Sequence, residues 1–580
     1  MSHRMRNLID TAQHISEADI VLKNGTIVDV FSLETYQADV AIHNGYIIGI
    51  GNYEQGSNCV DVSGKYIIPG LIDGHIHIES TMVTPSEFSR ALFRHGITTV
   101  VTDPHEIANV AGIEGIKYVI EDANSSLIDI LFKLPSCVPA TSFERNGATL
   151  TADDLYPLLS NEKVIGLAEV MDFHAVLTMQ EDMLNKLKMV KDRGMVIDGH
   201  AAGLSEQDLN IYSIASIRND HEAVTKDEAI DRVRRGFHVL VREGSAAKDL
   251  LALLPAISPQ NSTRFSFCTD DKHLDELVEE GTINYAMRLA IKHGLDPLIA
   301  IQMATINNAI CHQIENKGAV APGYVADLLL VDDLVELHPS HVIKDGRIFD
   351  LGSNKAELKK EKAAIPMSIQ ESINMKPISK EALQIIIADG QLANVIEIIP
   401  NQLITKKSIE KVLTKNGLFQ ANVADDQIKI AVCERHHATG GVGLGIVKGL
   451  KLNKGAIAST VAHDSHNLVV AGTNDDDMIL AIEAIRSMQG GLVIVSDGEV
   501  LAKVPLKIGG IMSEKPYEKV VEELHHLHEQ LRQVISGGEA VQNVFMILSF
   551  LCLPVIPSLK LTDKGLFDVD SFQHIEVGIK

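Results

Sequence analysis

Several features are absent from this 580-residue chain, and each absence excludes a class of protein or a kind of site. It has no tryptophan and only six cysteines, none of which forms a CxxC pair, so neither a zinc ribbon nor a dithiol redox motif is expected. Scattered thiols are typical of a reducing compartment, and we therefore expect a cytoplasmic protein. The N-terminal residues also lack the continuous apolar segment of a secretory signal.

Positive charge and long apolar runs are scarce as well. The chain has 52 Lys and Arg against 77 Asp and Glu, a formal net charge of -25. This excess argues against a nucleic-acid partner, which needs a basic footprint, and against an anionic membrane surface. The longest apolar stretch, 544–559, is shorter than the roughly 18 residues that span a bilayer and contains Pro554 and Pro557. We expect it to be a buried core segment.

What is present predicts an α/β protein with several domains. Residues 1–67 contain alternating apolar runs, and Asn24-Gly25 and Asn44-Gly45 each lie between two such runs, which predicts a hairpin at both places. The same pattern returns in 313–353, with Asp345-Gly346 as a turn. We therefore expect the two flanking segments to form one composite β-sandwich domain.

The segment between these flanks has a different pattern. In residues 68–312, short β-branched runs such as ITTVVTD, VIGLAEV and RFSFCTDD alternate with helical stretches. This alternation and a length near 250 residues predict a TIM-like (β/α)8 barrel. The charged residues 354–372 are predicted to be a linker, and 373–580 a C-terminal α/β domain that contains a late amphipathic helix.

The first residues that indicate chemistry are His75 and His77 in PGLIDGHIHIES. Residues two apart on a strand point to the same face, so both imidazoles can approach one metal ion where the strand ends at an open site. An HxH pair alone is common by chance. Here Pro69-Gly70 precedes the expected strand and Asp73-Gly74 lies directly before the pair, which favours a site.

Four further candidates lie at the ends of later expected strands: Glu169, His200, His221 and Asp270. A single polar residue at the end of a strand more often caps a helix or makes hydrogen bonds at the surface. Six such residues, at the ends of successive strands of a barrel, are hard to explain in that way. Imidazole and carboxylate suit Mn, Fe and Zn ions, and paired ions make hydroxide available at neutral pH. A carboxylate between two ions can bridge them, and an acid on the last strand can pass the proton of the attacking water to a leaving group.

The chain also resembles a known family over nearly its whole length. The stretches that carry the resemblance are GHIHIESTMVTPSEF, TDPHEIANVAG, GLAEVMD, IDGHAAGL, NDHE, REGSAAKD and FCTDDKH, followed by CERHHATGGVGLGIVKGL and STVAHDSHNLVVAGTNDDDM. They resemble the amidohydrolase superfamily and, within it, the bacterial adenine deaminase family. The resemblance implies hydrolytic deamination of adenine to hypoxanthine and ammonia in purine salvage, by attack of a metal-bound hydroxide on C6.

The resemblance implies a role for each candidate. The metal ligands would be His75, His77, Glu169, His200, His221 and Asp270, with Glu169 and Asp270 also catalytic. They would hold two divalent ions, with Mn or Fe favoured and Zn possible. Adenine as the small-molecule substrate rests on the resemblance alone, and we also expect a homo-oligomer.

Two other classes of function remain open at this point. One is another hydrolase on the same scaffold, such as an N-acetylglucosamine-6-phosphate deacetylase-like enzyme or a cyclic amidase. The C-terminal block and the TDPHEIAN motif argue against it. The other is a metal-free scaffold protein of the same fold, against which the six intact candidate ligands argue.

Further residues are predicted to contact substrate or support the site: Glu79, Asp103, His105, Arg242, Glu243 and Ser245. Asp103 has an alternative role as the cap of the next helix. His463, Asp464 and His466 in VAHDSHN can be interpreted as metal ligands or as braces of a loop near the active-site mouth.

Overall fold

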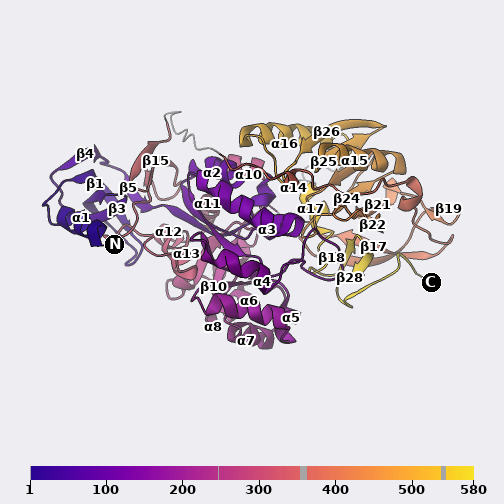
Figure 1. The fold of residues 1–580 in the computed structure, drawn as a ribbon, viewed down its shortest axis with the longest axis horizontal. Coiled ribbons are helices and arrows are strands. Elements are labelled where there is room, and N and C mark those ends of the chain that lie inside the picture. The colour runs from indigo at the N-terminus through magenta and orange to yellow at the C-terminus, as the bar shows by residue number, and fades with distance from the viewer. Residues whose placement is uncertain (1, 246, 353–361, 401, 537–543, 580) are drawn as a thin grey trace.

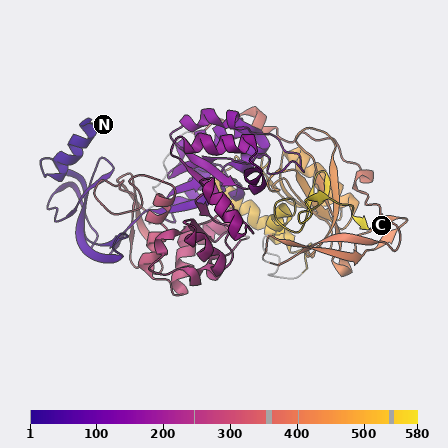
Figure 2. The same ribbon diagram turned by 90° about the horizontal axis from the view of Figure 1, so that it is seen from below.

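The computed structural model describes residues 2–245, 247–352, 362–400, 402–536 and 544–579. These residues form an α/β fold with several sheets arranged along one long axis (Figure 1). The N-terminal strands lie at one end and the C-terminal strands at the other, with the helices of the middle segment between them (Figures 1 and 2). Among the helices of these ranges, none is long and apolar enough to cross a membrane.

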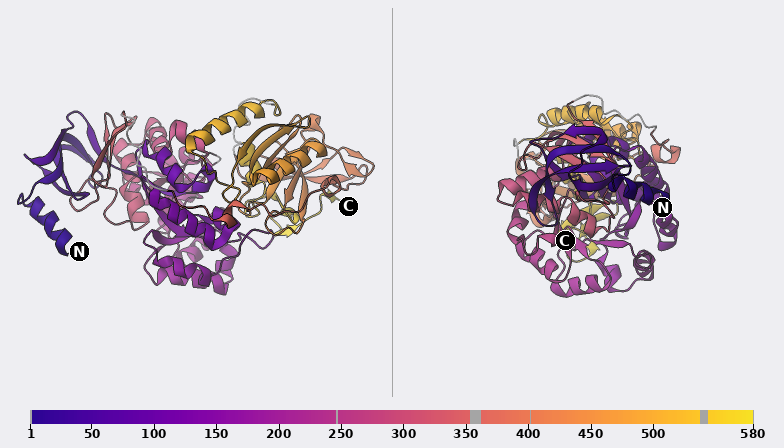
Figure 3. Two further views of the ribbon diagram at one scale, coloured as in Figure 1. Left: turned by 45° about the horizontal axis from the view of Figure 1, so that its top comes forward. Right: turned by 90° about the vertical axis from the view of Figure 1, so that its left-hand side faces the viewer.

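The first sheet combines strands from both flanks of the middle segment (Figure 3). Its order is β16-β15-β14-β5-β1-β2-β3, and β4 also pairs with β1. The strands are β1 (Ala18–Asp29), β2 (Glu34–His43), β3 (Tyr46–Gly51), β4 (Gly56–Asp61), β5 (Tyr66–Pro69), β14 (Leu328–Val331), β15 (Pro339–Lys344) and β16 (Arg347–Asp350). Because β14 pairs antiparallel with β5, the later flank extends the sheet that the earlier one begins. The exact domain bounds stay a prediction.

Two of the three turn predictions in this sheet are confirmed. Asn44-Gly45 joins β2 to β3, and Asp345-Gly346 joins β15 to β16. All four residues have positive φ, between 49° and 81°, the backbone that two-residue hairpins of this kind require.

The hairpin predicted at Asn24-Gly25 is wrong. Strand β1 continues through this pair with a register shift between Leu22 and Gly25, so the dipeptide forms a bulge rather than a turn. A Cβ at Gly25 would lie 2.5 Å from Cδ1 of Ile67 on the neighbouring strand, so a larger residue there would require that side chain to shift.

The middle segment contains two parallel sheets, a five-stranded one in the order β10-β9-β8-β7-β6 and a three-stranded one in the order β11-β12-β13. The strands are β6 (Leu71–Ile76), β7 (Ile97–Thr102), β8 (Asp129–Leu134), β9 (Val164–Val170), β10 (Val196–Gly199), β11 (Asn219–Asp220), β12 (His238–Arg242) and β13 (Phe265–Cys268). Within each sheet the strands follow sequence order, so their carboxyl ends share one edge.

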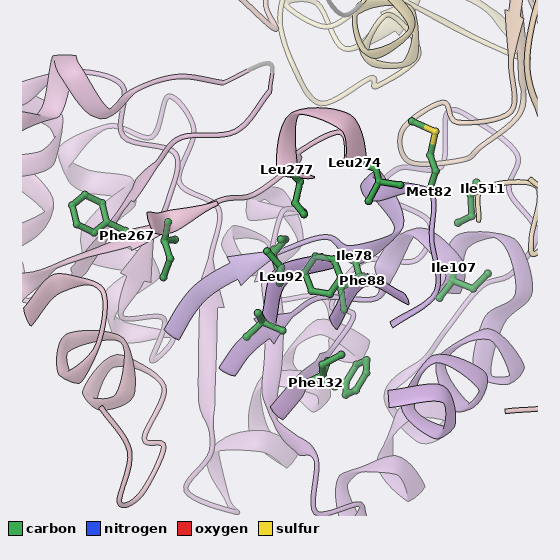
Figure 4. Close-up of a cluster of buried hydrophobic side chains, with 14 of the residues drawn as sticks. Ile78, Met82, Phe88, Leu92, Ile107, Phe132, Phe267, Leu274, Leu277 and Ile511 are labelled. Carbon is green, nitrogen blue, oxygen red and sulfur yellow. The ribbon is translucent and has the colours of Figure 1, made fainter. Parts of the chain in front are cut away.

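Helices separate these strands and follow the last one. They include α2 (Pro85–Phe93), α3 (His105–Asp122), α6 (Glu181–Lys191), α7 (Glu206–Ile214), α8 (Lys226–Arg234), α10 (Leu274–Glu280), α11 (Ile283–Lys292), α12 (Pro297–Met303) and α13 (Ile306–Cys311). Their apolar faces pack on the strands: Phe88 and Leu92 of α2 lie near Phe132 of β8 and Leu277 of α10 in one buried cluster (Figure 4). Burying each such side chain contributes about 1.5–3 kcal/mol.

The C-terminal segment is built on a nine-stranded mixed sheet of order β18-β17-β22-β21-β24-β23-β25-β26, with β30 pairing with β17. Its strands are β17 (Leu392–Ile398), β18 (Thr405–Lys411), β21 (Ile428–Cys433), β22 (Val442–Lys448), β23 (Ala456–Ser459), β24 (Leu468–Gly472), β25 (Gly491–Ser496), β26 (Glu499–Pro505) and β30 (Gly578–Ile579). Its longer helices are α15 (Asp475–Met488), α16 (Tyr517–Leu531) and α17 (Val544–Phe550). The predicted amphipathic helix is α16, and α17 begins the predicted core segment. Residues 354–361 of the predicted linker lie outside the described residues.

The C-terminal segment packs against the strand edge that carries the carboxyl ends. The Ser513 backbone N–H donates to the carbonyl of Met82 at 2.8 Å, just beyond β6. Ile511 lies in the same buried cluster as Met82 and Ile107 of α3 (Figure 4). Side chains of both segments therefore meet above the ends of β6 and β7.

Candidate metal centre

The six candidate ligands come together at this strand edge. His75 and Glu169 lie on β6 and β9, and the others directly follow or come just after a strand: His77 after β6, His200 after β10, His221 after β11 and Asp270 after β13. His200 is partly exposed, and the other five residues are at most 6% exposed. Groups of these atoms lie close enough together to hold a metal ion.

The Glu169 carboxylate lies between two pairs of histidines. Its Oε1 is 3.3 Å from Nε2 of His77 and 3.9 Å from Nε2 of His75. Its Oε2 is 2.6 Å from Nδ1 of His200 and 3.4 Å from Nε2 of His221. Burial opposes ionisation, but hydrogen bonds from His200 and His221 hold the pKa of Glu169 well below its usual value. An ionised carboxylate thus offers one oxygen to each pair.

Asp270 approaches the same centre from the last strand. Its Oδ1 is 3.2 Å from Nε2 of His77 and 3.6 Å from Nε2 of His75, and its Oδ2 accepts a hydrogen bond from Nη1 of Arg242 at 2.9 Å. Burial opposes ionisation, yet these histidines and Arg242 hold the pKa of Asp270 well below its usual value.

The prediction that Asp270 closes the strand was wrong. Strand β13 ends at Cys268, and Asp270 has a left-handed φ of 63° in the following turn. A single parallel bridge to Ile76 keeps this turn beside β6. The direction of its side chain is therefore set by the turn and not by strand alternation.

Two of the histidines turn Nε2 toward the position that a metal ion would take. Nδ1 of His77 lies 3.2 Å from the Asp103 carbonyl oxygen, to which it donates, and Nε2 faces Glu169 and Asp270. Burial opposes protonation, but these two carboxylates raise the pKa of His77 well above its usual value, so a metal ion would displace a proton from Nε2. Nε2 of His75 is buried with no hydrogen-bond partner among the described residues. Burial and the neighbouring His221 lower the pKa of His75, which favours neutral imidazole. The residues present therefore fit a divalent metal.

Asp103 and His105 also lie beside the centre, but they bind each other. The Asp103 carboxylate accepts from Nδ1 of His105 at 2.9 Å and from its backbone N–H at 3.1 Å, so it holds the ring and the first residue of α3 together. Nε2 of His105 is 3.2 Å from Glu106. Burial opposes protonation, but Asp103 and Glu106 raise the pKa of His105 well above its usual value. A charged His105 thus stands 3.7 Å from Glu169.

Arg242 braces the centre together with a carboxylate that sequence analysis missed. Arg242 pairs with Glu222 as well as Asp270, and Oε1 of Glu222 is 3.3 Å from Nε2 of His221 and 3.8 Å from Nδ1 of His200. Burial opposes its ionisation, but Arg242 and His200 lower the pKa of Glu222. The sequence did contain a signal for Glu222, because it directly follows the candidate ligand His221 in the NDHE motif.

The other predicted support residues make contacts within the protein. Glu79 was expected on the strand face of His77, but it lies in the 3-10 turn Ile78–Thr81, where Oε1 accepts from the Ile107 backbone at 3.2 Å. Ser245 donates from Oγ to Glu276 at 2.6 Å. Burial raises the pKa of Glu243 to about 7. Contacts of these residues with substrate stay predictions.

Comparison with known proteins places the chain in a family. Residues 66–352 match the model of the amidohydrolase family, and residues 402–573 match the adenine deaminase C-terminal domain. An adenine deaminase of Lysinibacillus sphaericus is 52% identical over 97% of this chain and 96% of its own length. The chain belongs to the adenine deaminase family. An adenine deaminase of Geobacillus kaustophilus is 49% identical over the full length of both proteins, so both parts of this family member have counterparts in its relatives.

Solved structures resemble this member of the adenine deaminase family more distantly. A β-aspartyl dipeptidase of Fervidobacterium islandicum aligns with a TM-score of 0.46 and 18% identity, covering 60% of this chain and all of that one. A dihydropyrimidinase of Brevibacillus agri aligns with a TM-score of 0.43 and 15% identity, covering 57% of this chain and 94% of that one. The family assignment rests on the sequence relatives.

Proposed function

We propose that this protein hydrolyses adenine to hypoxanthine and ammonia. The observation that carries the proposal is the match to adenine deaminases over nearly the full length of both chains. The buried cluster of histidines and carboxylates supplies the ligands that such a hydrolysis needs. The alternative hydrolases considered from the sequence have no comparable support among these relatives.

We infer that the two parallel sheets together form a closed (β/α)8 barrel. The parallel bridge between Ile76 and Asp270 links the first and last strands. On the other side, the side-chain carbonyl of Asn219 on β11 accepts from the Gly199 backbone on β10 at 2.9 Å. Closure would explain why residues from β6 and β13 converge on one centre.

We further propose that two divalent ions bind, one with each histidine pair, and that Glu169 bridges them. The division of the Glu169 oxygens between His75 with His77 and His200 with His221 supports this arrangement. Mn or Fe is favoured and Zn is possible, since imidazole and carboxylate suit all three. Bound ions would supply an activated water at neutral pH and stabilise developing negative charge.

The roles of the chain's own residues follow from their contacts. Water adds to C6 of the purine, and the C6–N bond to the exocyclic amine breaks. Asp270, kept ionised by its neighbours, accepts a proton from the attacking water and returns it to the departing nitrogen. Arg242 holds Oδ2 of Asp270, which orients Oδ1 toward the centre. Homo-oligomerisation and a cytoplasmic location stay predictions.

The number of ions is directly testable. Six candidate ligands on five strands exceed what one tetrahedral ion uses, so active enzyme is expected to contain two ions per chain. Elemental analysis of protein reconstituted with Mn, Fe or Zn, with activity followed during the titration, measures this number. Full activity at one ion per chain would contradict the binuclear arrangement.

The substrate is tested by ammonia release across purines. We expect the metal-loaded protein to deaminate free adenine and to turn over adenosine with a kcat/KM lower by about 100-fold or more, equivalent to about 2.7 kcal/mol. Guanine serves as a second comparison because it also carries an exocyclic amine. An equal or higher kcat/KM for adenosine would show that the substrate assignment is wrong while leaving the hydrolytic chemistry intact.

A further inference from the structure

The carboxylate of Glu222 faces one histidine pair in the same way as Asp270 faces the other. Oε1 of Glu222 is 3.3 Å from Nε2 of His221 and 3.8 Å from Nδ1 of His200. Oδ1 of Asp270 is 3.2 Å and 3.6 Å from Nε2 of the two histidines that follow it in the other pair. The two carboxylates therefore stand at nearly the same distances from their histidines.

These distances are typical of neighbouring ligands on one metal ion. Nitrogen and oxygen ligands lie about 2.1 Å from a divalent ion, which puts adjacent ligand atoms roughly 3–4 Å apart. Oε2 of Glu169 is 2.6 Å from Nδ1 of His200 and 3.4 Å from Nε2 of His221, the same two nitrogens that Glu222 faces. His200, His221 and Glu222 also form one of the groups with metal-ligand spacing. Two carboxylate oxygens thus approach the same pair of imidazole nitrogens.

Glu222 can face the same way as its neighbour because both residues lie beyond a strand. Strand β11 ends one residue before His221, so strand alternation does not turn the two side chains to opposite faces. The side chains of Glu222 and His200 are 13% and 15% exposed, against 4% and 3% for His75 and His77. An ion held at His200 and Glu222 would be the more accessible of the two to water and substrate.

Arg242 orients both of these carboxylates. Its Nη1 donates to Oε1 of Glu222 and, at 2.9 Å, to Oδ2 of Asp270, and its Nη2 donates to Oε2 of Glu222 at 3.3 Å. A carboxylate oxygen has two lone pairs, so Oε1 can accept this hydrogen bond and still bind an ion. Carboxylates that bind metals are in turn held by hydrogen bonds of this kind. Arg242 thus fixes one carboxylate toward each histidine pair.

Another group with metal-ligand spacing, Glu106 with His463 and His466, has hydrogen bonds that indicate a different role. Nδ1 of His463 lies 2.5 Å from Oε1 of Glu106, and Nε2 of His466 is hydrogen-bonded to Oε2. The Ala462 backbone N–H donates to Nδ1 of His466 at 3.2 Å, so a neutral His466 has its proton on Nε2 and no lone pair there for a metal. This group is a clamp that fixes the loop 460–467, between β23 and β24, on α3.

We propose that Glu222 is a further metal ligand, which binds through Oε1 the ion held by His200 and His221. The inference rests on the two ions of the proposed function and adds a seventh ligand to the six predicted ones. Each ion then has a carboxylate of its own, Asp270 or Glu222, in addition to the shared Glu169.

The additional ligand bears on which metal fits the site. Catalytic zinc ions have three protein ligands and one open position. With Glu169 and Glu222 as well as its two histidines, this ion has four protein ligands, and an open position for water makes five. Mn and Fe accept up to six ligands, so Glu222 favours them over Zn.

Replacing Glu222 with glutamine tests the ligand directly, because glutamine keeps the shape of the side chain but lacks its charge. We expect the dissociation constant of one Mn²⁺ ion to rise by more than about 100-fold, beyond the roughly 10- to 100-fold that loss of a supporting residue costs, and that of the other ion to change by less than about 3-fold. Equilibrium dialysis of metal-free protein against Mn²⁺, followed by elemental analysis, measures both constants.

The visible absorption of Co²⁺-loaded protein separates ligation from charge. The bands of Co²⁺ depend on the number and kind of its ligands, so Glu222→Gln should change them. Glu222→Asp keeps the charge but is shorter by one methylene group, and it should change them as well. A purely electrostatic role would leave the bands of Glu222→Asp like those of the wild type.

The matched control is Asp249→Asn. Asp249 also pairs with Arg242, at 3.0 Å, but among the described residues its carboxylate has no ion pair with a candidate ligand. This variant removes one partner of Arg242 and leaves the histidines with all of theirs. Its affinity for both ions should stay within about 10-fold of the wild type, below the usual effect of losing a residue that supports a ligand, and its Co²⁺ bands should be unchanged.

The inference fails if Glu222→Gln keeps wild-type affinity for both ions, weakens both equally, or leaves the Co²⁺ bands unchanged. It also fails if Asp249→Asn reproduces the loss of one ion. These results are distinct from failure of the proposed function, which would appear as wild-type protein that holds two ions but releases no ammonia from adenine.

Discussion

Replacing Glu169 with glutamine should remove bound metal and lower kcat for adenine by at least about 1000-fold, or about 4 kcal/mol in activation free energy. The reason lies in the division of its oxygens between two histidine pairs, 2.6 Å from His200 and 3.3 Å from His77 at the closest. Glutamine keeps the shape but has one oxygen and no charge, so it cannot serve both pairs. Elemental analysis and ammonia release on the same preparation measure the two losses together.

A matched control separates this effect from the general cost of changing a buried carboxylate. Asp122 of α3 is 1% exposed and accepts a hydrogen bond from the Ser86 backbone at 2.8 Å, away from the candidate ligands. Asp122→Asn is expected to affect stability while keeping the metal content and kcat of the wild type. A Glu169→Gln protein that still held two ions per chain and turned over adenine at nearly the wild-type rate would refute the bridging role.

Local patterns predicted the elements of this protein well where local geometry decides the outcome. The runs ending at Thr102, Val170 and Arg242 are strands, as their β-branched composition indicates. The two Asn-Gly pairs show where prediction from local patterns fails. At 44–45 the pair forms a hairpin, but at 24–25 the same dipeptide is a bulge inside β1, which pairs with β2 on one side and with β4 and β5 on the other. That pairing with later strands is a tertiary contact, which the local pattern does not contain.

The candidate site also contains residues that local patterns predict and contacts that only the folded chain creates. Residues at or just after the ends of strands, such as Glu169 and His200, were identifiable because parallel strands bring their carboxyl ends to one edge. The bracing of His221 by Glu222 was not predicted, since it depends on a tertiary contact between Glu222 and Arg242 at the end of β12. The contact between Glu106 and His463 joins residues 357 positions apart, and no spacing rule reaches that far.

Asp270→Asn is expected to keep the fold and at least part of the metal while lowering kcat by about 10²–10⁴-fold, or about 3–5 kcal/mol. The carboxylate faces Nε2 of His77 at 3.2 Å, and Arg242 holds its second oxygen. Its pKa is held well below the usual value, so it enters the reaction ionised and able to accept a proton. Asparagine keeps one oxygen near the histidines but cannot accept that proton.

The neighbouring Asp271 is the rival for this role, and the two carboxylates differ in environment. Strand alternation does not separate them, because the chain turns at Asp270. Asp271 accepts a hydrogen bond from the Ser80 hydroxyl, and burial together with Asp270 raises its pKa. Asparagine keeps an oxygen that can accept from the Ser80 hydroxyl, so Asp271→Asn should lower kcat by less than about 10-fold, well under the full contribution of a general base. Parallel measurement of kcat and metal content decides between them: if Asp271→Asn is the more damaging variant while metal is retained, the proton-transfer role belongs to Asp271.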